Sequence, residues 1–80
     1  MREYTVKQVV AEHNGVYDAW EVGIAEGQNE RDALVRFLDE SKVSGNIRAY
    51  KNIRAKGNFF TVDIEDKGWN DSMFILEENG

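Results

Sequence analysis

The residues best suited to acid–base catalysis are the single histidine and the carboxylates, and their positions favour a structural role. His13 directly precedes Asn14 and Gly15, a pair typical of a tight turn, whereas a catalytic histidine needs a pocket and a group that orients its ring. The acids of Glu65-Asp66 and Glu77-Glu78 are adjacent in sequence, and adjacent residues of a strand point to opposite faces. We therefore predict that the protein is not an enzyme.

The chain also lacks the residue patterns that bind metals and cofactors. It has no cysteine and only one histidine, which excludes disulfides, thiolate zinc sites and iron–sulfur clusters. Its glycines fall at predicted turns and form no phosphate-binding loop pattern. We predict no cofactor and no metal.

Basic and aromatic residues that could contact a macromolecule alternate along one predicted strand. They are Arg48, Tyr50, Arg54 and Lys56, followed by Phe59 across the next turn. Arginines interleaved with aromatic rings on a sheet can hold phosphates and stack bases. The expected partner strand places Asp63 and Glu65 on the same face, where they neutralise part of this positive charge. The pattern favours a protein partner, and a small nucleic-acid-binding domain is the alternative.

Two further features could mark a binding surface. Trp69 follows a glycine turn and is flanked by Lys67 and Asp71, a setting typical of an interface anchor, although the ring could equally cover the edge of a small core. Acidic residues gather around the predicted helix and again near residues 63–78. If aligned on one side, they could imitate a phosphate backbone. The sequence leaves open which of these surfaces binds.

The first elements in the chain are predicted to be two strands, over residues 2–12 and 16–26. Val16, Trp20, Val22 and Ile24 share one face of the second strand. A two-residue turn would separate the apolar faces of the two strands, because a one-residue slip moves every side chain to the other face. We therefore expect a three-residue or bulged turn, which pairs Val10 with Trp20 and Val6 with Ile24.

The apolar period then changes from two to about 3.6, which predicts a helix over residues 30–42. Ala33, Leu34, Phe37 and Leu38 form its apolar stripe. Asn29 is the expected N-cap, because its side-chain oxygen can accept a hydrogen bond from the first helical turn.

The remaining residues predict a second hairpin and a C-terminal strand. Strands over residues 46–56 and 59–66 are joined by Gly57-Asn58, with Ala55 opposite Phe60 and Ile53 opposite Val62 beneath the helix. On the other face the expected pairs are Arg54–Thr61, Asn52–Asp63 and Tyr50–Glu65. For residues 69–76 we favour a strand over a short helix capped by Asp71. The predicted fold is α+β, a single domain of residues 1–80 with an antiparallel sheet of four to five strands and one helix on one face.

Composition and charge add an expected location. The 80 residues carry a net charge of −5, yet residues 42–56 contain five bases and no acid. The longest apolar run, Met73–Leu76, is far shorter than the roughly 20 residues that span a bilayer. The N-terminus lacks the apolar segment of a signal peptide. We expect a cytoplasmic protein with no membrane contact.

In size, acidity and mixture of strands and helix, the chain resembles the small inhibitors that phages and mobile elements encode, anti-CRISPR proteins among them. The resemblance covers no motif and transfers no residue roles. It implies a small acidic protein that acts by contact with another protein, as an inhibitor or accessory factor. The sequence is compatible with a monomer and with a homodimer.

Overall fold

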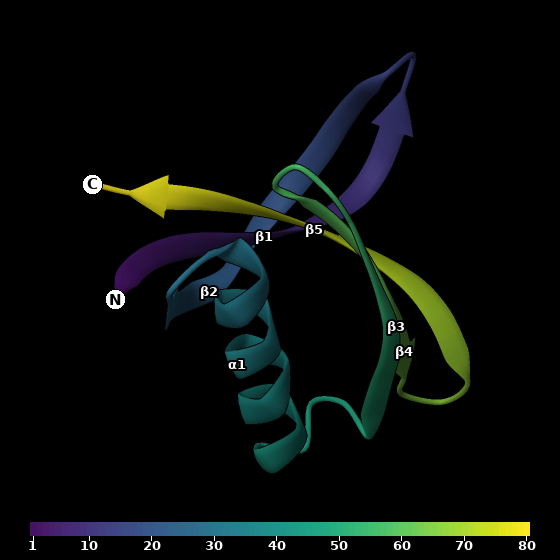
Figure 1. Ribbon diagram of the computed structural model, residues 1–80. Coiled ribbons are helices and arrows are strands. Elements are labelled where there is room, and N and C mark those ends of the chain that lie inside the picture. The colour runs from purple at the N-terminus through teal and green to yellow at the C-terminus, as the bar shows by residue number, and fades with distance from the viewer.

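Five strands and one helix make up the protein. The computed structural model describes all 80 residues. The elements are β1 (Arg2–His13), β2 (Val16–Gly27), α1 (Glu30–Val43), β3 (Ala49–Lys56), β4 (Phe59–Glu65) and β5 (Trp69–Asn79). The strands form one antiparallel sheet in the order β2-β1-β5-β4-β3, and α1 covers part of one face (Figure 1). The predicted α+β fold is confirmed. The helix is neither long nor apolar enough to cross a membrane.

The C-terminal strand occupies the centre of the sheet. The prediction of a strand rather than a short helix is confirmed, and β5 extends to Asn79. It pairs with β1 on one side and with β4 on the other. Phe74 and Leu76 on this strand are buried. The last strand in the sequence therefore joins the two hairpins into one sheet.

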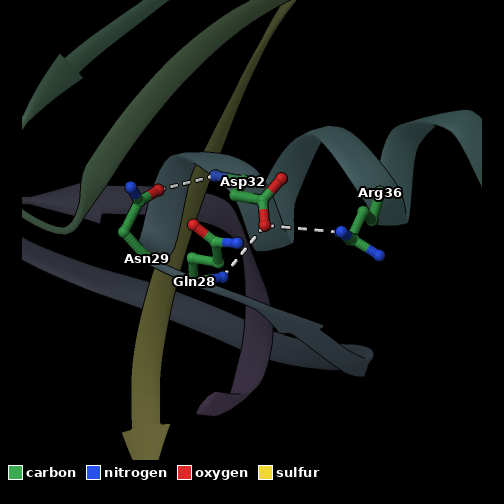
Figure 2. Close-up of polar contacts among 4 residues, drawn as sticks. All are labelled: Gln28, Asn29, Asp32 and Arg36. Atoms are coloured by element: carbon green, nitrogen blue, oxygen red, sulfur yellow. Dashed lines mark hydrogen bonds and ion pairs between the residues drawn. The ribbon is translucent and has the colours of Figure 1, made fainter. Parts of the chain in front are cut away.

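A network of polar side chains fixes the start of α1, as Figure 2 shows. The side-chain oxygen of Asn29 accepts a hydrogen bond of 2.8 Å from the Asp32 amide, which confirms Asn29 as the N-cap. One Asp32 carboxylate oxygen accepts from the Gln28 amide at 2.9 Å and lies 3.3 Å from Nε of Arg36. The Gln28 amide lowers the pKa of Asp32, with a smaller contribution from Arg36.

The join between β2 and α1 is unusually close. Gly27 is buried where the helix turns back over the strand. A Cβ atom at this position would clash with the backbone nitrogen of Ala33 and lie 2.8 Å from its Cα. Only glycine fits such an approach without moving the first turn of the helix.

One cluster of 11 buried residues forms the core between α1 and the sheet. The helix contributes Ala33, Leu34 and Leu38, and the strands contribute Tyr4, Val6, Ala25, Phe60, Val62, Ile64, Phe74 and Leu76. The helix packs mainly on β2, where the Phe37 ring lies against the backbone of Gly23. The core thus sits at the end of the first hairpin that is remote from its turn.

The register of the first hairpin differs from the predicted one. Its turn is the two-residue Asn14-Gly15, because His13 pairs with Val16. Irregularities at Val10 on β1 and Val22 on β2 each insert one unpaired residue, and the two shifts cancel. The predicted three-residue or bulged turn and the pairs Val10–Trp20 and Val6–Ile24 are wrong. Packing decides the register, since small residues, Gly23 and Ala25, must face the helix.

The second hairpin contains a bulge that reverses the far half of β3. Ala55 pairs with Phe60 and Arg54 with Thr61, as predicted, but the register then shifts between Lys51 and Arg54. Asn52 adopts a φ of 55° within this irregularity, a backbone conformation that asparagine tolerates better than most residues. Lys51 therefore pairs with Asp63, and the predicted Asn52–Asp63 pair is wrong.

The same bulge turns Tyr50 towards the helix. Tyr50 pairs with Ile64 instead of the predicted Glu65. Its hydroxyl donates a hydrogen bond of 2.6 Å to Oδ1 of Asp39 on α1. This hydrogen bond, with burial and the carboxylate charge, raises the pKa of Tyr50 to about 12. Tyr50 thus ties the edge strand β3 to the helix.

Replacing Tyr50 with phenylalanine removes the hydrogen bond to Asp39 and should cause a pH-dependent loss of stability. A folded-state pKa of about 12 exceeds the ordinary value of 10.0, so the stabilisation is complete below pH 10.0 and disappears as the pH rises through 12. We expect Tyr50→Phe to lower the free energy of unfolding by about 1 kcal/mol near neutral pH. The difference from the wild type should vanish near pH 12. Thermal unfolding followed by circular dichroism measures both.

Tyr17→Phe is the matched control. The Tyr17 hydroxyl makes no hydrogen bond within the protein, and its ring contact with Phe59 is kept in the variant. We expect its stability to follow that of the wild type across the same pH range. A Tyr50→Phe variant as stable as the wild type near neutral pH would contradict the assigned role of the hydrogen bond.

Candidate functional site

Most of the predicted site residues share the sheet face that points away from α1. This outer face carries Arg54, Lys56, Phe59, Trp69 and Asp71. Tyr50 lies on the opposite face, against the helix. Arg48 precedes β3, where its amide donates to the Glu65 carbonyl at 2.8 Å and its side chain is exposed. The outer face therefore brings together five of the seven predicted residues.

The charges on the outer face are paired with one another. Nη2 of Arg54 lies 3.1 Å from an Asp63 oxygen and 3.9 Å from an Asp71 oxygen. The side-chain amide of Asn52 donates to Asp63 at 2.8 Å. The hydrogen bond from Asn52 is the largest of the effects that lower the pKa of Asp63, whereas the neighbouring Asp63 raises the pKa of Asp71. Arg54 is thus committed to two carboxylates.

Sequence reasoning missed the pairing of Asp63 with Asp71. These residues lie directly opposite each other on β4 and β5. The signal was present, because a three-residue turn over residues 66–68 sets Glu65 opposite Trp69 and so Asp63 opposite Asp71.

Trp69 also has a partner within the protein. Its ring is 47% exposed, and Nζ of Lys51 lies 4.1 Å from the ring centroid. A cation over an aromatic face is held by the electrostatic field of the ring. Lys51 reaches Trp69 because the bulge at Asn52 places Lys51 on the outer face. The charged side chains and the Trp69 ring of the outer face therefore mostly contact one another.

A second surface, on the first hairpin, is apolar and exposed. This apolar hairpin surface consists of Val16, Trp20 and Val22 on the helix side of β2, which are 42–69% exposed. Trp20 is the most exposed of them, at 69%. The turn end of the hairpin extends well beyond the helix (Figure 1), and Val16 and Trp20 in this part of β2 are 67% and 69% exposed. The predicted face of Val16, Trp20, Val22 and Ile24 is wrong for Ile24, because the unpaired Val22 reverses the strand and turns Ile24 to the outer face.

Element lengths account for the exposure. The 12 residues of β2 span about 40 Å, whereas the 14 residues of α1 span about 21 Å. One helix packed at the Gly27 end of the hairpin therefore cannot reach the residues near the turn. This comparison of lengths is the signal by which the open surface could have been predicted.

An aromatic contact holds the first hairpin against the outer face of the sheet. Tyr17 on β2 and Phe59 on β4 have ring centroids 5.2 Å apart. Strands three positions apart in a flat sheet are separated by about 14 Å, so the hairpin must bend over the outer face. The irregularities at Val10 and Val22 allow this bend, since bulges increase the local twist. Trp20, three residues from Tyr17 on a regular stretch of strand, points to the other side.

A cleft of about 320 Å³ lies beneath the second half of α1. Its lining includes Val22 and the neighbouring Gln8, which pairs with Trp20 across the hairpin. Phe37 and Phe74 form part of its floor, and Asp66 is its one ionisable residue. The cleft therefore continues the apolar hairpin surface and suits an inserted side chain better than a reaction that needs two titratable groups.

Comparison with protein-family models, with curated proteins and with solved structures found no significant match. The functional inference consequently rests on the surfaces of the chain itself. Of the two surfaces, the outer face has its charges and its tryptophan engaged internally. The apolar hairpin surface has no such partners, and it is the stronger candidate for binding.

Proposed function

We propose that this chain is a non-catalytic protein that acts by binding another protein through the apolar hairpin surface. The observation that carries the proposal is the 69% exposure of Trp20 beside the exposed Val16 and Val22 on the same side of the hairpin. Large exposed apolar patches mark interaction sites in folded proteins, and tryptophan is enriched among the residues that dominate binding energy.

The first hairpin is also ordered before a partner binds. The Tyr17–Phe59 contact fixes its back, and the sheet fixes its base through the pairing of β1 with β5. A surface that is already ordered loses less conformational entropy when a partner binds. The adjacent cleft can receive a side chain of the partner next to Trp20.

Charge favours a protein over a nucleic acid as the partner. Residues 8–30, which include the whole exposed part of the hairpin, contain five acids and no lysine or arginine. Phosphate binding depends on accumulated positive charge, and Arg54 is already paired with Asp63 and Asp71. We infer an inhibitor or accessory factor that acts in the cytoplasm, in keeping with the composition of small phage-encoded inhibitors.

The chain offers two partly exposed tryptophans for a matched test. A photo-crosslinking amino acid is placed at position 20 or at position 69, and adducts are identified by mass spectrometry in cells that encode the protein. The affinity of the captured partner is then measured for Trp20→Ser and Trp69→Ser. We expect a protein adduct at position 20 and a loss of affinity of about 10- to 100-fold for Trp20→Ser. Trp69→Ser should change the affinity by less than about threefold.

Two results would contradict the proposal. One is a protein adduct at position 69 without any at position 20. The other is micromolar binding of labelled single-stranded DNA or RNA that weakens steeply with salt and further in Arg54→Ala, which would support the nucleic-acid-binding alternative.

A further inference from the structure

The edge of the sheet at β2 is long and has no strand beside it. β2 pairs only with β1, so 12 residues of strand leave one row of backbone N–H and C=O groups without a strand partner. Exposed edges in natural proteins are normally blocked by lysine, proline or a short strand. β2 contains no lysine and no proline, and its side chains include the exposed Trp20, Val22 and Ile24.

The opposite edge of the sheet shows the usual protection. β3 has eight residues and carries Lys51, Arg54 and Lys56, whereas β2 has 12 residues and no base. Each edge strand contains one irregularity, at Asn52 in β3 and at Val22 in β2. The two edges of the sheet therefore differ in length and in charge. The open edge at β2 is suited to pairing with a further strand.

The surroundings of the open edge are acidic. β2 itself carries Asp18, Glu21 and Glu26 and no base. A groove of about 570 Å³ runs between β2 and α1, and Glu26 and Glu40 are among the residues that line it. Its one basic residue, Arg36, is 3.3 Å from Asp32 and so has a carboxylate partner. A strand added beside β2 would place side chains next to this groove and meet mainly negative charge.

We infer that β2 binds an extended, basic segment of a partner protein by strand addition, with lysine or arginine alternating with apolar residues. The inference rests on the proposed function and specifies the kind of partner. Backbone hydrogen bonds would supply affinity, and the apolar and acidic side chains would supply specificity. Pairing of two β2 strands from two copies would bring together three acids from each strand and no base, which disfavours a second copy as the occupant.

Three labelled peptides test this inference by fluorescence anisotropy on the intact protein. One alternates lysine and valine, the second alternates glutamate and valine, and the third is the lysine peptide with alternate amides N-methylated. We expect the lysine peptide to bind at least about 10-fold more tightly than the glutamate peptide. N-methylation should abolish binding, because it removes the donors that pair with the edge. Hydrogen exchange should show new protection of β2 amides and none in β3.

Two double variants with the same change in net charge separate local from general electrostatics. Glu21→Gln with Glu26→Gln, on β2, should weaken the lysine peptide by about 3- to 10-fold. Glu77→Gln with Glu78→Gln, on β5, should leave its affinity within about twofold. Equal weakening by both pairs, or equal binding of the N-methylated peptide, would overturn the inference.

Two further outcomes would also overturn it. Concentration-dependent association of the protein without peptide, with protection at β2, would assign the edge to a second copy. A protein partner that crosslinks at position 20 while the β2 amides of its complex stay unprotected would refute strand addition and leave the proposed function standing.

Discussion

Gly27→Ala is expected to leave the protein largely unfolded. The added Cβ would meet backbone atoms of Ala33, which cannot rotate away as a side chain could. Overpacking of this kind costs up to about 3 kcal/mol. A shift of the first turn of α1 would also weaken the N-cap of Asn29, worth about 1 kcal/mol. Domains of this size rarely exceed about 3–5 kcal/mol of net stability. Urea unfolding followed by circular dichroism measures the loss.

Gly68→Ala is the control for the same chemical change. A Cβ at Gly68 would meet no atom within 4 Å, and its φ lies outside the left-handed region. We expect an unfolding midpoint close to that of the wild type. If Gly27→Ala kept the wild-type midpoint, the close approach of helix and strand would not constrain the fold.

The second large effect is a contrast between two aromatic residues. Phe60 is 1% exposed in the core, whereas Trp20 is 69% exposed on the hairpin. Phe60→Ala is expected to cost about 3–5 kcal/mol through lost burial and a cavity, enough to unfold most of the protein. Trp20→Ala should change the free energy of unfolding by no more than about 0.5 kcal/mol. Chemical denaturation of both variants provides the comparison.

This contrast bears directly on the proposed function. A tryptophan that contributes little to stability is not needed by the fold. Its exposure on an ordered hairpin is therefore explained better by binding than by folding. If Trp20→Ala destabilised the protein as strongly as Phe60→Ala, Trp20 would belong to the core. The apolar hairpin surface would then lose its main residue.

Local patterns in the sequence were sufficient for the helix and for four of the five strands, and for residues 69–76 they favoured a strand over a short helix. The Asn29 cap and the apolar stripe of α1 depend on residues three or four apart, and α1 forms over residues 30–43 against the predicted 30–42. The turn at Gly57-Asn58 likewise sets the first pairs of its hairpin, Ala55 with Phe60 and Arg54 with Thr61. These contacts are settled by near neighbours.

Register beyond the turns depended on contacts that no local pattern encodes. The inserted residues Val10 and Val22 follow from the need to place Gly23 beneath Phe37. The bulge at Asn52 follows the contact of Tyr50 with Asp39, eleven residues away. For the candidate site, the apolar residues of the hairpin were visible in the sequence, but their exposure depends on how far α1 reaches along the sheet.

The central position of β5 has a consequence for folding during translation. The two hairpins have no direct pairing with each other, because β5 lies between β1 and β4. Since β5 is the last of the five strands to be synthesised, the nascent chain cannot close its sheet until residues 69–79 have left the exit tunnel. Until then, β1 and β4 each expose an edge. Folding of this domain is therefore completed after its synthesis rather than during it.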